Sequence, residues 1–290
     1  MQIYRAWLGL PALGLLLAGC DIDTADPSEE LRLESPHFVF HSCEDHTTLA
    51  EMEAGLQRAE TLYDRMAEMV GSTNAPLDKI QVHLDGDVTD QGPYVDFDGI
   101  HLFRYSTDDG GYWALLAHEM GHSFGVPWFV RMGAWDWPTY RFFDEGFAEF
   151  LAQSVDPHKR GFPFYGFHED AVVGQWLVRN EDVPLDVLRA QHAHLNRPCE
   201  IQAYPERASW FRFVDETYGR EATLSLAYPH TEPTSDVVHG LLGVRLDELD
   251  QAWEAWILSR YAALPGADHV AQSYRERTSW AHVCRAGVDY

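Results

Sequence analysis

Apolar residues recur at helical spacing between Leu49 and Val70, and this pattern predicts an amphipathic helix. Gly71 follows directly and is expected to end it. Short alternating or aromatic-rich stretches on either side of this helix and beyond it predict three strands, at 37–42, 78–84 and 99–105. The first part of the domain is therefore expected to be a small mixed sheet with a helix connecting its strands.

The pattern becomes helical after Gly110 and Gly111, which break the chain before an apolar stretch at 112–129. Pro138 is expected to begin a second helix that runs to about Val155. Six further segments have helical character: 168–180, 184–190, 204–217, 222–227, 235–242 and 246–262. Strands followed by helices indicate the α+β class.

The first twenty residues consist of one arginine followed by an apolar run too short for a comfortable transmembrane helix. The run ends in Leu-Ala-Gly-Cys, which resembles the lipobox of bacterial lipoproteins. This resemblance implies that 1–20 is a signal peptide and that Cys20 is lipidated and becomes the mature N-terminus. The alternative is an ordinary signal peptide with a chance cysteine. Residues 21–35 then form an acidic tether, and 36–290 form the folded domain, with subdomains at 36–125 and 126–290.

The charge of the chain narrows the choice of partners. The formal net charge is −25, so the surface repels nucleic acid and anionic lipid headgroups. No apolar run after Cys20 is long enough to span a bilayer. We therefore expect no nucleic-acid partner. We also expect an exported, membrane-anchored protein on the periplasmic or cell-surface side, held to the membrane only by its N-terminal lipid.

Three cysteines follow Cys20, namely Cys43, Cys199 and Cys284. In an oxidising compartment they predict one disulfide and one remaining thiol. The sequence does not determine which pair forms. The cysteines are too far apart in the chain for a zinc-thiolate cluster, which usually contains close pairs.

The stretch 112–129 contains His118, Glu119 and His122 in an H-E-x-x-H arrangement. On a helix the two histidines lie one turn apart on the same face, where both can bind one zinc ion. Glu119 is rotated by about 100° around the helix and can act as a general base on a zinc-bound water. Because the chain has fifteen histidines, the H-E-x-x-H arrangement could occur by chance. A third ligand in the right place would distinguish a metal site from a chance match.

Two positions compete for the third ligand. The glycine three residues after His122 begins a metzincin-type pattern, but the position where its next ligand should fall is Trp128, which cannot bind zinc. In the second helix, Glu145 and Glu149 are four residues apart and share a face. One can complete a His-His-Glu site, and the other can accept a hydrogen bond from a ligand histidine. Gly146 is expected to let this helix approach the metal helix closely.

The sequences HEMGH (118–122) and DEGFAEF (144–150) together resemble the gluzincin zinc metallopeptidases. The resemblance implies that His118, His122 and Glu145 bind one zinc ion and that Glu119 is the base. It also places Glu149 behind a ligand histidine. It implies a zincin-like fold, with a small N-terminal mixed sheet, an active-site helix and a mainly helical C-terminal subdomain.

The resemblance extends in pattern over most of 36–262. The spacing from His122 to Glu145 is a few residues longer than in familiar gluzincins, and we place the extra residues in an aromatic loop at 126–137. The resemblance also implies an edge strand at 99–105, able to pair with an extended peptide. In one branch of the superfamily a tyrosine at the start of a later helix stabilises the oxyanion, which matches Tyr204. His192 and His194 compete for this role, and a purely structural tyrosine is the alternative.

The expected function is that of an exported zinc metallopeptidase acting on a peptide or protein. A zinc-activated water attacks the peptide bond, and Glu119 is the general base. Three alternatives remain open. The chain can be an inactive lipoprotein that binds zinc or peptide, a hydrolase of cell-wall amides on the same fold, or a structural lipoprotein with a chance motif.

Overall fold

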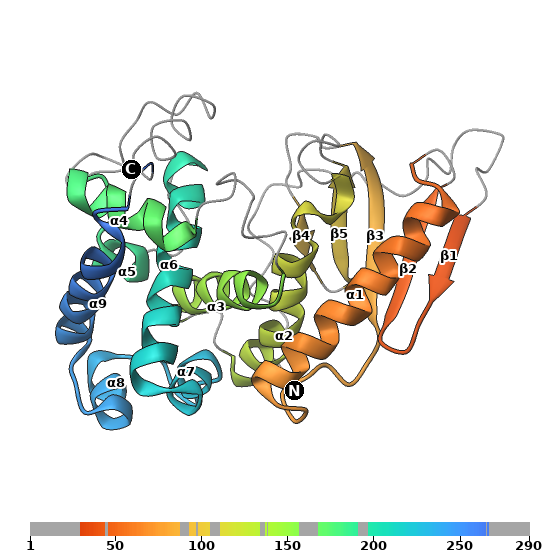
Figure 1. Cartoon of the computed structure of the whole chain (residues 1–290). Coiled ribbons are helices and arrows are strands. Elements are labelled where there is room, and N and C mark those ends of the chain that lie inside the picture. The colour runs from red at the N-terminus through yellow and green to blue at the C-terminus, as the bar shows by residue number, and fades with distance from the viewer. Residues whose placement is uncertain are drawn as a thin grey trace, which may run out of the picture.

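The computed structural model describes residues 30–43, 46–87, 93–96, 98–104, 111–133, 137, 139–156, 168–190, 197–264 and 266. The expected signal peptide with Cys20 lies outside these residues, as do His192 and His194. The described part of the chain has an α+β fold, with a five-stranded mixed sheet and a mostly helical remainder. Figure 1 shows the sheet and the first helix on one side, the later helices on the other, and two helices, α2 and α3, between them.

The sheet has the strand order β1-β2-β3-β5-β4. Its strands are β1 (Glu30–Glu34), β2 (Phe38–Cys43), β3 (Ile80–Asp87), β4 (Tyr94–Val95) and β5 (Ile100–Arg104). The three central strands are parallel, and β1 and β4 are antiparallel to their neighbours. A parallel pair needs a long crossover, and α1 (Leu49–Val70) supplies it between β2 and β3.

Helix α1 has the bounds that the sequence predicts. Its N-terminus is fixed by a capping box: the Thr48 hydroxyl accepts a hydrogen bond from the Glu51 amide, and the Glu51 carboxylate accepts one from the Thr48 amide. Its buried stripe includes Met52, Leu62 and Met66. This stripe joins the apolar side chains of the inner sheet face in the core. Local capping and a 3.6-residue apolar period therefore both specify this helix.

The outer face of the sheet carries a stacked row of aromatic side chains. The rings of His41, His83, His101 and Tyr94 lie on neighbouring strands, with successive centroids 5.0, 4.7 and 4.5 Å apart. Nδ1 of His101 lies 2.7 Å from the Asp85 carboxylate, and the pair raises the pKa of His101 although burial opposes this. Burial lowers the pKa of His83. One sheet face is therefore polar, while the other supplies the core.

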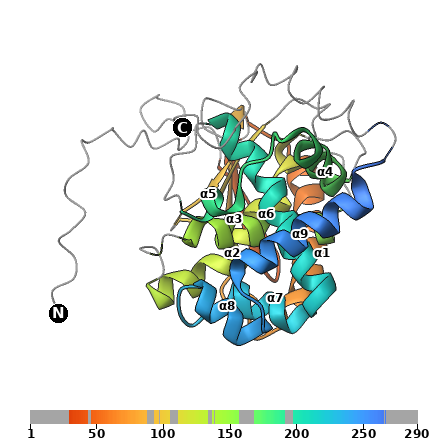
Figure 2. The ribbon, with the colours of Figure 1, turned by 90° about the vertical axis from the view of Figure 1, so that its left-hand side faces the viewer.

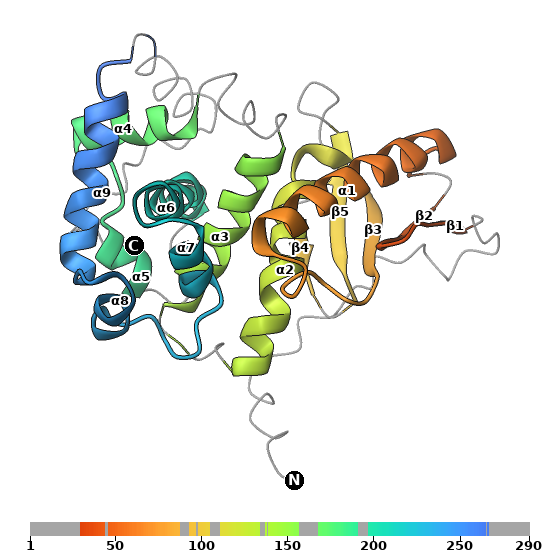
Figure 3. The same ribbon diagram turned by 60° about the horizontal axis from the view of Figure 1, so that its bottom comes forward.

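The remainder of the described chain is helical. After the short 3-10 helix η2 (Gly111–Ala114) come α2 (Leu116–Met132), α3 (Tyr140–Val155), α4 (Glu169–Arg179), α5 (Leu185–Ala190), α6 (Arg197–Tyr218), α7 (Arg220–Ala227), α8 (Ser235–Leu242) and α9 (Leu246–Tyr261). Seen from the helical side, α7, α8 and α9 lie toward the viewer (Figure 2). In Figure 3, α6 is seen nearly end-on between α3 and the pair α4 and α9.

Several sequence expectations are wrong in detail. Residues 30–34 form β1, so the predicted tether cannot extend to 35. The segment 126–132 belongs to α2 rather than to a loop, although Pro127 removes one helical hydrogen bond. Helix α6 begins seven residues before Tyr204, which is therefore inside the helix. Strand β5 is not the sheet edge at its start, because β4 pairs with Ile100 and His101.

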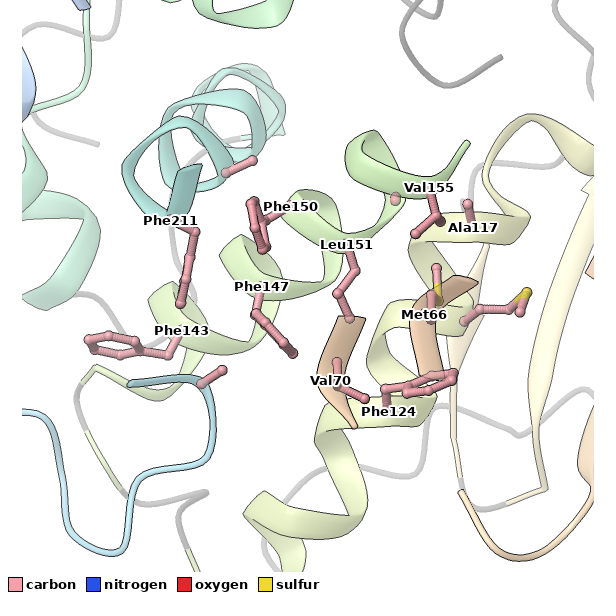
Figure 4. Close-up of a cluster of buried hydrophobic side chains, with 14 of the residues drawn as sticks. Met66, Val70, Ala117, Phe124, Phe143, Phe147, Phe150, Leu151, Val155 and Phe211 are labelled. Atoms are coloured by element: carbon pink, nitrogen blue, oxygen red, sulfur yellow. The ribbon is translucent and has the colours of Figure 1, made fainter. Parts of the chain in front are cut away.

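The close contact between α2 and α3 depends on a glycine, but not on Gly146. A Cβ atom on Gly146 would lie 2.9 Å from Cβ of Arg207, so Gly146 faces α6. A Cβ atom on Gly121 would lie 2.6 Å from Cα of Ala148 and 2.7 Å from its carbonyl oxygen. Gly121 therefore sets the spacing between the two helices. Apolar side chains fill the space around this contact, as Figure 4 shows for Phe147 and its neighbours.

We expect Gly121→Ala to lower the free energy of unfolding by about 1–3 kcal/mol, because the added methyl group must push α2 away from the α3 backbone. Gly240→Ala is the matched control. This glycine lies in α8 with no atom within 4 Å of the added Cβ, and the substitution should be neutral or stabilise the helix by up to about 1 kcal/mol. Denaturant unfolding of both variants measures the difference. Equal stability of the Gly121 variant and the unmodified protein would contradict the close contact.

Cys43 is disulfide-bonded at the end of β2. This agrees with the expected disulfide, and its partner lies outside the described side chains, so the pairing stays open. None of the helices in the described residues combines the length and the apolar character needed to cross a bilayer.

Candidate metal centre

Helices α2 and α3 bring three predicted ligands together. His118 and His122 lie one turn apart on α2, and Glu145 faces them from α3. Oε2 of Glu145 is 3.4 Å from Nε2 of His118 and 3.2 Å from Nε2 of His122. The two Nε2 atoms are 3.2 Å apart. All three side chains are buried, and together they could hold a metal ion.

Carboxylates behind the two histidines determine which ring nitrogen faces the centre. Nδ1 of His118 lies 2.7 Å from Oε2 of Glu149, and Nδ1 of His122 lies 3.2 Å from Oδ2 of Asp144. A carboxylate only accepts hydrogen bonds, so each Nδ1 carries the proton and donates it. In the neutral rings, both Nε2 lone pairs then point toward each other and toward Glu145. A cation placed between these acceptors could bind all three of them.

The three distances fit a zinc ion. Tetrahedral coordination with bonds of about 2.05 Å places neighbouring ligand atoms about 3.3 Å apart. The observed separations are 3.2, 3.2 and 3.4 Å. Oε2 of Glu145 is buried and faces both Nε2 atoms, so this oxygen is placed as a third ligand. Two histidines and one carboxylate also form the ligand set of a catalytic zinc site, which leaves one position for water.

Charge complementarity holds the three groups together without a metal. Burial lowers the pKa of both histidines, but nearby carboxylates outweigh burial and raise it, most strongly for His122 beside Asp144 and Glu145. Burial raises the pKa of Glu145, and the two histidines lower it to well below its usual value. Because these shifts favour protonated histidines beside an ionised Glu145, metal binding must compete with protons.

Two further predicted residues lie beside His118. Glu119 is buried on α2, directly after His118 and about 100° around the helix from it. Tyr204 reaches the site from α6, where its ring packs edge-on against the His118 ring with centroids 5.2 Å apart. His118 and His122 from α2, Glu145 and Glu149 from α3, and Tyr204 from α6 are therefore in mutual contact, and Glu119 lies next to His118 on α2.

Asp144 and Tyr140 are site residues that the sequence analysis missed. Asp144 accepts from His122, and the Tyr140 hydroxyl is hydrogen-bonded to Asp144. Burial and the Asp144 charge raise the pKa of Tyr140, which keeps the phenol protonated as the donor. The available signal was that Asp144 directly precedes Glu145. Two histidines need two carboxylate partners, and Asp144 is the acid that remains for His122 when Glu149 pairs with His118.

An isolated acid lies behind this layer. Glu169, in the first turn of α4, is buried, and neither carboxylate oxygen has a hydrogen-bond partner among the described residues. Burial raises the pKa of Glu169 to about 7, and the negative charges of Glu149 and Asp170 contribute to the rise. Because the folded pKa exceeds the ordinary value of 4.5, folding favours the protonated acid. Ionisation of Glu169 therefore costs stability as the pH rises from 4.5 to 7.

We expect Glu169→Gln to stabilise the fold in a pH-dependent way. The gain should be near zero below pH 4.5, where both side chains are neutral, and should reach about 3 kcal/mol above pH 7. Denaturant unfolding at several pH values measures it. The control, Glu53→Gln on the exposed face of α1, should give no such slope. A gain that does not change with pH would contradict an isolated, titrating Glu169.

Comparison with known proteins adds no family assignment. No family model matches the chain, and no curated protein matches it in sequence.

Proposed function

We propose that this chain is a zinc-dependent peptidase of the gluzincin type with a zincin-like fold. The proposal rests on one observation above all: two Nε2 atoms and one carboxylate oxygen converge at the spacing of a tetrahedral zinc site. A glutamate follows the first ligand histidine directly, where a general base is needed. The resemblance of 118–122 and 144–150 to gluzincin motifs supports peptide bonds as the substrate.

Each side chain of the centre has a separate role in the proposed hydrolysis. When bound by His118, His122 and Glu145, zinc supplies Lewis acidity and lowers the pKa of a water in its open position. Glu119 accepts the proton of the attacking water and then delivers it to the leaving nitrogen. Tyr204 donates a hydrogen bond to the oxyanion that develops on the carbonyl oxygen. Glu149 and Asp144 hold the histidine rings in orientation throughout.

The site also favours hydrolysis over a purely structural zinc role. Structural zinc sites are closed by four protein ligands, usually including cysteine, whereas the group found among the described residues supplies three ligands and no cysteine. The lipobox-like 17–20 supports export and lipidation at Cys20. We therefore place the enzyme on the periplasmic or cell-surface side of a bacterial membrane, with peptides or proteins as substrates.

The decisive experiment is cleavage of a mixed peptide library by the purified full chain, with products identified by mass spectrometry. We expect cleavage by the zinc-loaded protein, loss of cleavage after chelation and recovery when zinc is restored. A zinc-loaded protein that cleaves no peptide would overturn the peptidase proposal. Cell-wall fragments assayed in parallel distinguish a hydrolase of cell-wall amides from a binding protein.

A further inference from the structure

A line of buried polar side chains runs from the metal centre through four helices. It starts at His118 on α2, whose Nδ1 lies 2.7 Å from Oε2 of Glu149 on α3. Oε1 of Glu149 accepts a hydrogen bond from Nε2 of Gln153, one turn later, at 3.0 Å. Arg212 on α6 donates to Oε1 of Gln153 and forms an ion pair with Asp170 on α4 at 2.7 Å. Figure 3 shows α3, α6 and α4 as successive neighbours.

The Arg212 guanidinium determines which group donates each hydrogen bond along this line. A guanidinium only donates hydrogen bonds, so Gln153 must turn its carbonyl oxygen toward Arg212. The Gln153 amide nitrogen then faces Glu149 and donates to it. If the amide turned over, its oxygen would face the Glu149 carboxylate and repel it. Arg212 therefore fixes the orientation of Gln153, and Gln153 holds Glu149 as an acceptor for His118.

Burial makes this arrangement rigid. The side chains of Gln153 and Asp170 are fully or almost fully buried, and that of Arg212 is 13% exposed. Burial lowers the pKa of Arg212, but the adjacent Asp170 outweighs burial and raises it, so the guanidinium stays charged. Since charged partners inside a protein are costly to separate, the line has one favourable arrangement.

We infer that Gln153 and Arg212 are positioning residues for the metal centre, acting on the ligand His118 through Glu149. Their task is to hold the His118 ring in the orientation in which Nδ1 faces Glu149 and Nε2 faces the metal. Neither residue touches the proposed substrate or the metal. The inference rests on the proposed zinc site and extends it by two layers of side chains.

The test is the zinc dissociation constant, measured by competition with a chromophoric chelator. Gln153→Met is close in volume and cannot hold Glu149, and we expect it to weaken zinc binding by about ten- to a hundredfold. Arg212→Met should weaken it by about tenfold, because Gln153 can then turn over. The residues act in series, so the double variant should bind zinc no more weakly than Gln153→Met alone.

Arg189→Met is the matched control for a general loss of packing. Arg189 is also buried and forms a bidentate ion pair with an aspartate, Asp250, but it is not part of the line to His118. We expect this variant to lose fold stability and to keep the zinc affinity of the unmodified protein. If Arg212→Met does not fold, Gln153→Met still carries the test, because it leaves the Arg212–Asp170 ion pair in place.

The outcomes separate two failures. If the unmodified protein binds no zinc, the proposed function fails and this inference fails with it. If the unmodified protein binds zinc and both Gln153→Met and Arg212→Met bind it equally well, only the positioning role is overturned. Additive effects in the double variant would also overturn it, because independent effects do not form a series.

Discussion

Glu119→Gln is expected to keep zinc bound and to reduce peptide hydrolysis by about a thousandfold or more. The amide has the same shape as the carboxylate, but it cannot accept the proton of the attacking water, and general-base catalysis contributes about 10²–10⁴-fold. Glu119 is buried beside His118 without belonging to the ligand group, so its loss leaves His118, His122 and Glu145 intact. Parallel zinc analysis and peptide-cleavage rates measure the two effects.

Glu149→Gln is the informative comparison, because it changes a neighbouring glutamate with a different task. Glu149 orients His118 and is not placed to take the proton, so its variant should bind zinc more weakly and hydrolyse well once saturated. The two variants should therefore separate catalysis from binding. Retained hydrolysis in Glu119→Gln at full zinc occupancy would show that another group is the base.

Much of the secondary structure is predictable because local signals agree. Helix α1 combines a capping box, a regular apolar stripe and a terminal glycine, and its bounds match the prediction. Strand β1 was missed because only Leu31 and Leu33 in it are apolar, alternating with charged residues in an acidic segment. Strand β4 has two residues, too few for any periodic pattern. It forms only because it pairs with β5, and this pairing depends on tertiary structure rather than on local sequence.

The residues of the candidate metal centre are predictable where one helix fixes their geometry. Spacings of four residues place His118 with His122, and Glu145 with Glu149, on common faces. How two helices face each other is not a local property. This is why Gly146 was assigned to the α2 contact that Gly121 makes.

The layers behind the ligands are harder still to predict. Gln153, Arg212 and Asp170 are far apart in sequence, and each alone is typical of an ordinary polar helix position. Only the packing of α3, α6 and α4 makes them one hydrogen-bonded line.

Glu145→Gln is expected to weaken zinc binding by at least about a hundredfold. Removal of a hydrogen-bond partner behind a ligand already lowers metal affinity by about ten- to a hundredfold. Removal of the ligand itself should lower the affinity further. The amide keeps the packing of α3 but removes the negative charge that Nε2 of both histidines face at 3.2–3.4 Å. Competition titration with a chelator measures the dissociation constant. Glu216→Gln removes an exposed carboxylate on α6 and should leave the constant unchanged.

The pH dependence of binding gives the same site a second test. The pKa values of His118 and His122 are raised above 6.5 in the metal-free protein, chiefly because the facing carboxylates outweigh burial. Protons therefore compete with zinc at a higher pH than they would at ordinary histidines, and zinc affinity should fall as the pH is lowered. Glu145→Gln removes one of those carboxylates, so the histidines should lose their protons at lower pH and the fall should begin at lower pH. Zinc binding that survives the substitution with an unchanged pH profile would mean that the third ligand is not Glu145.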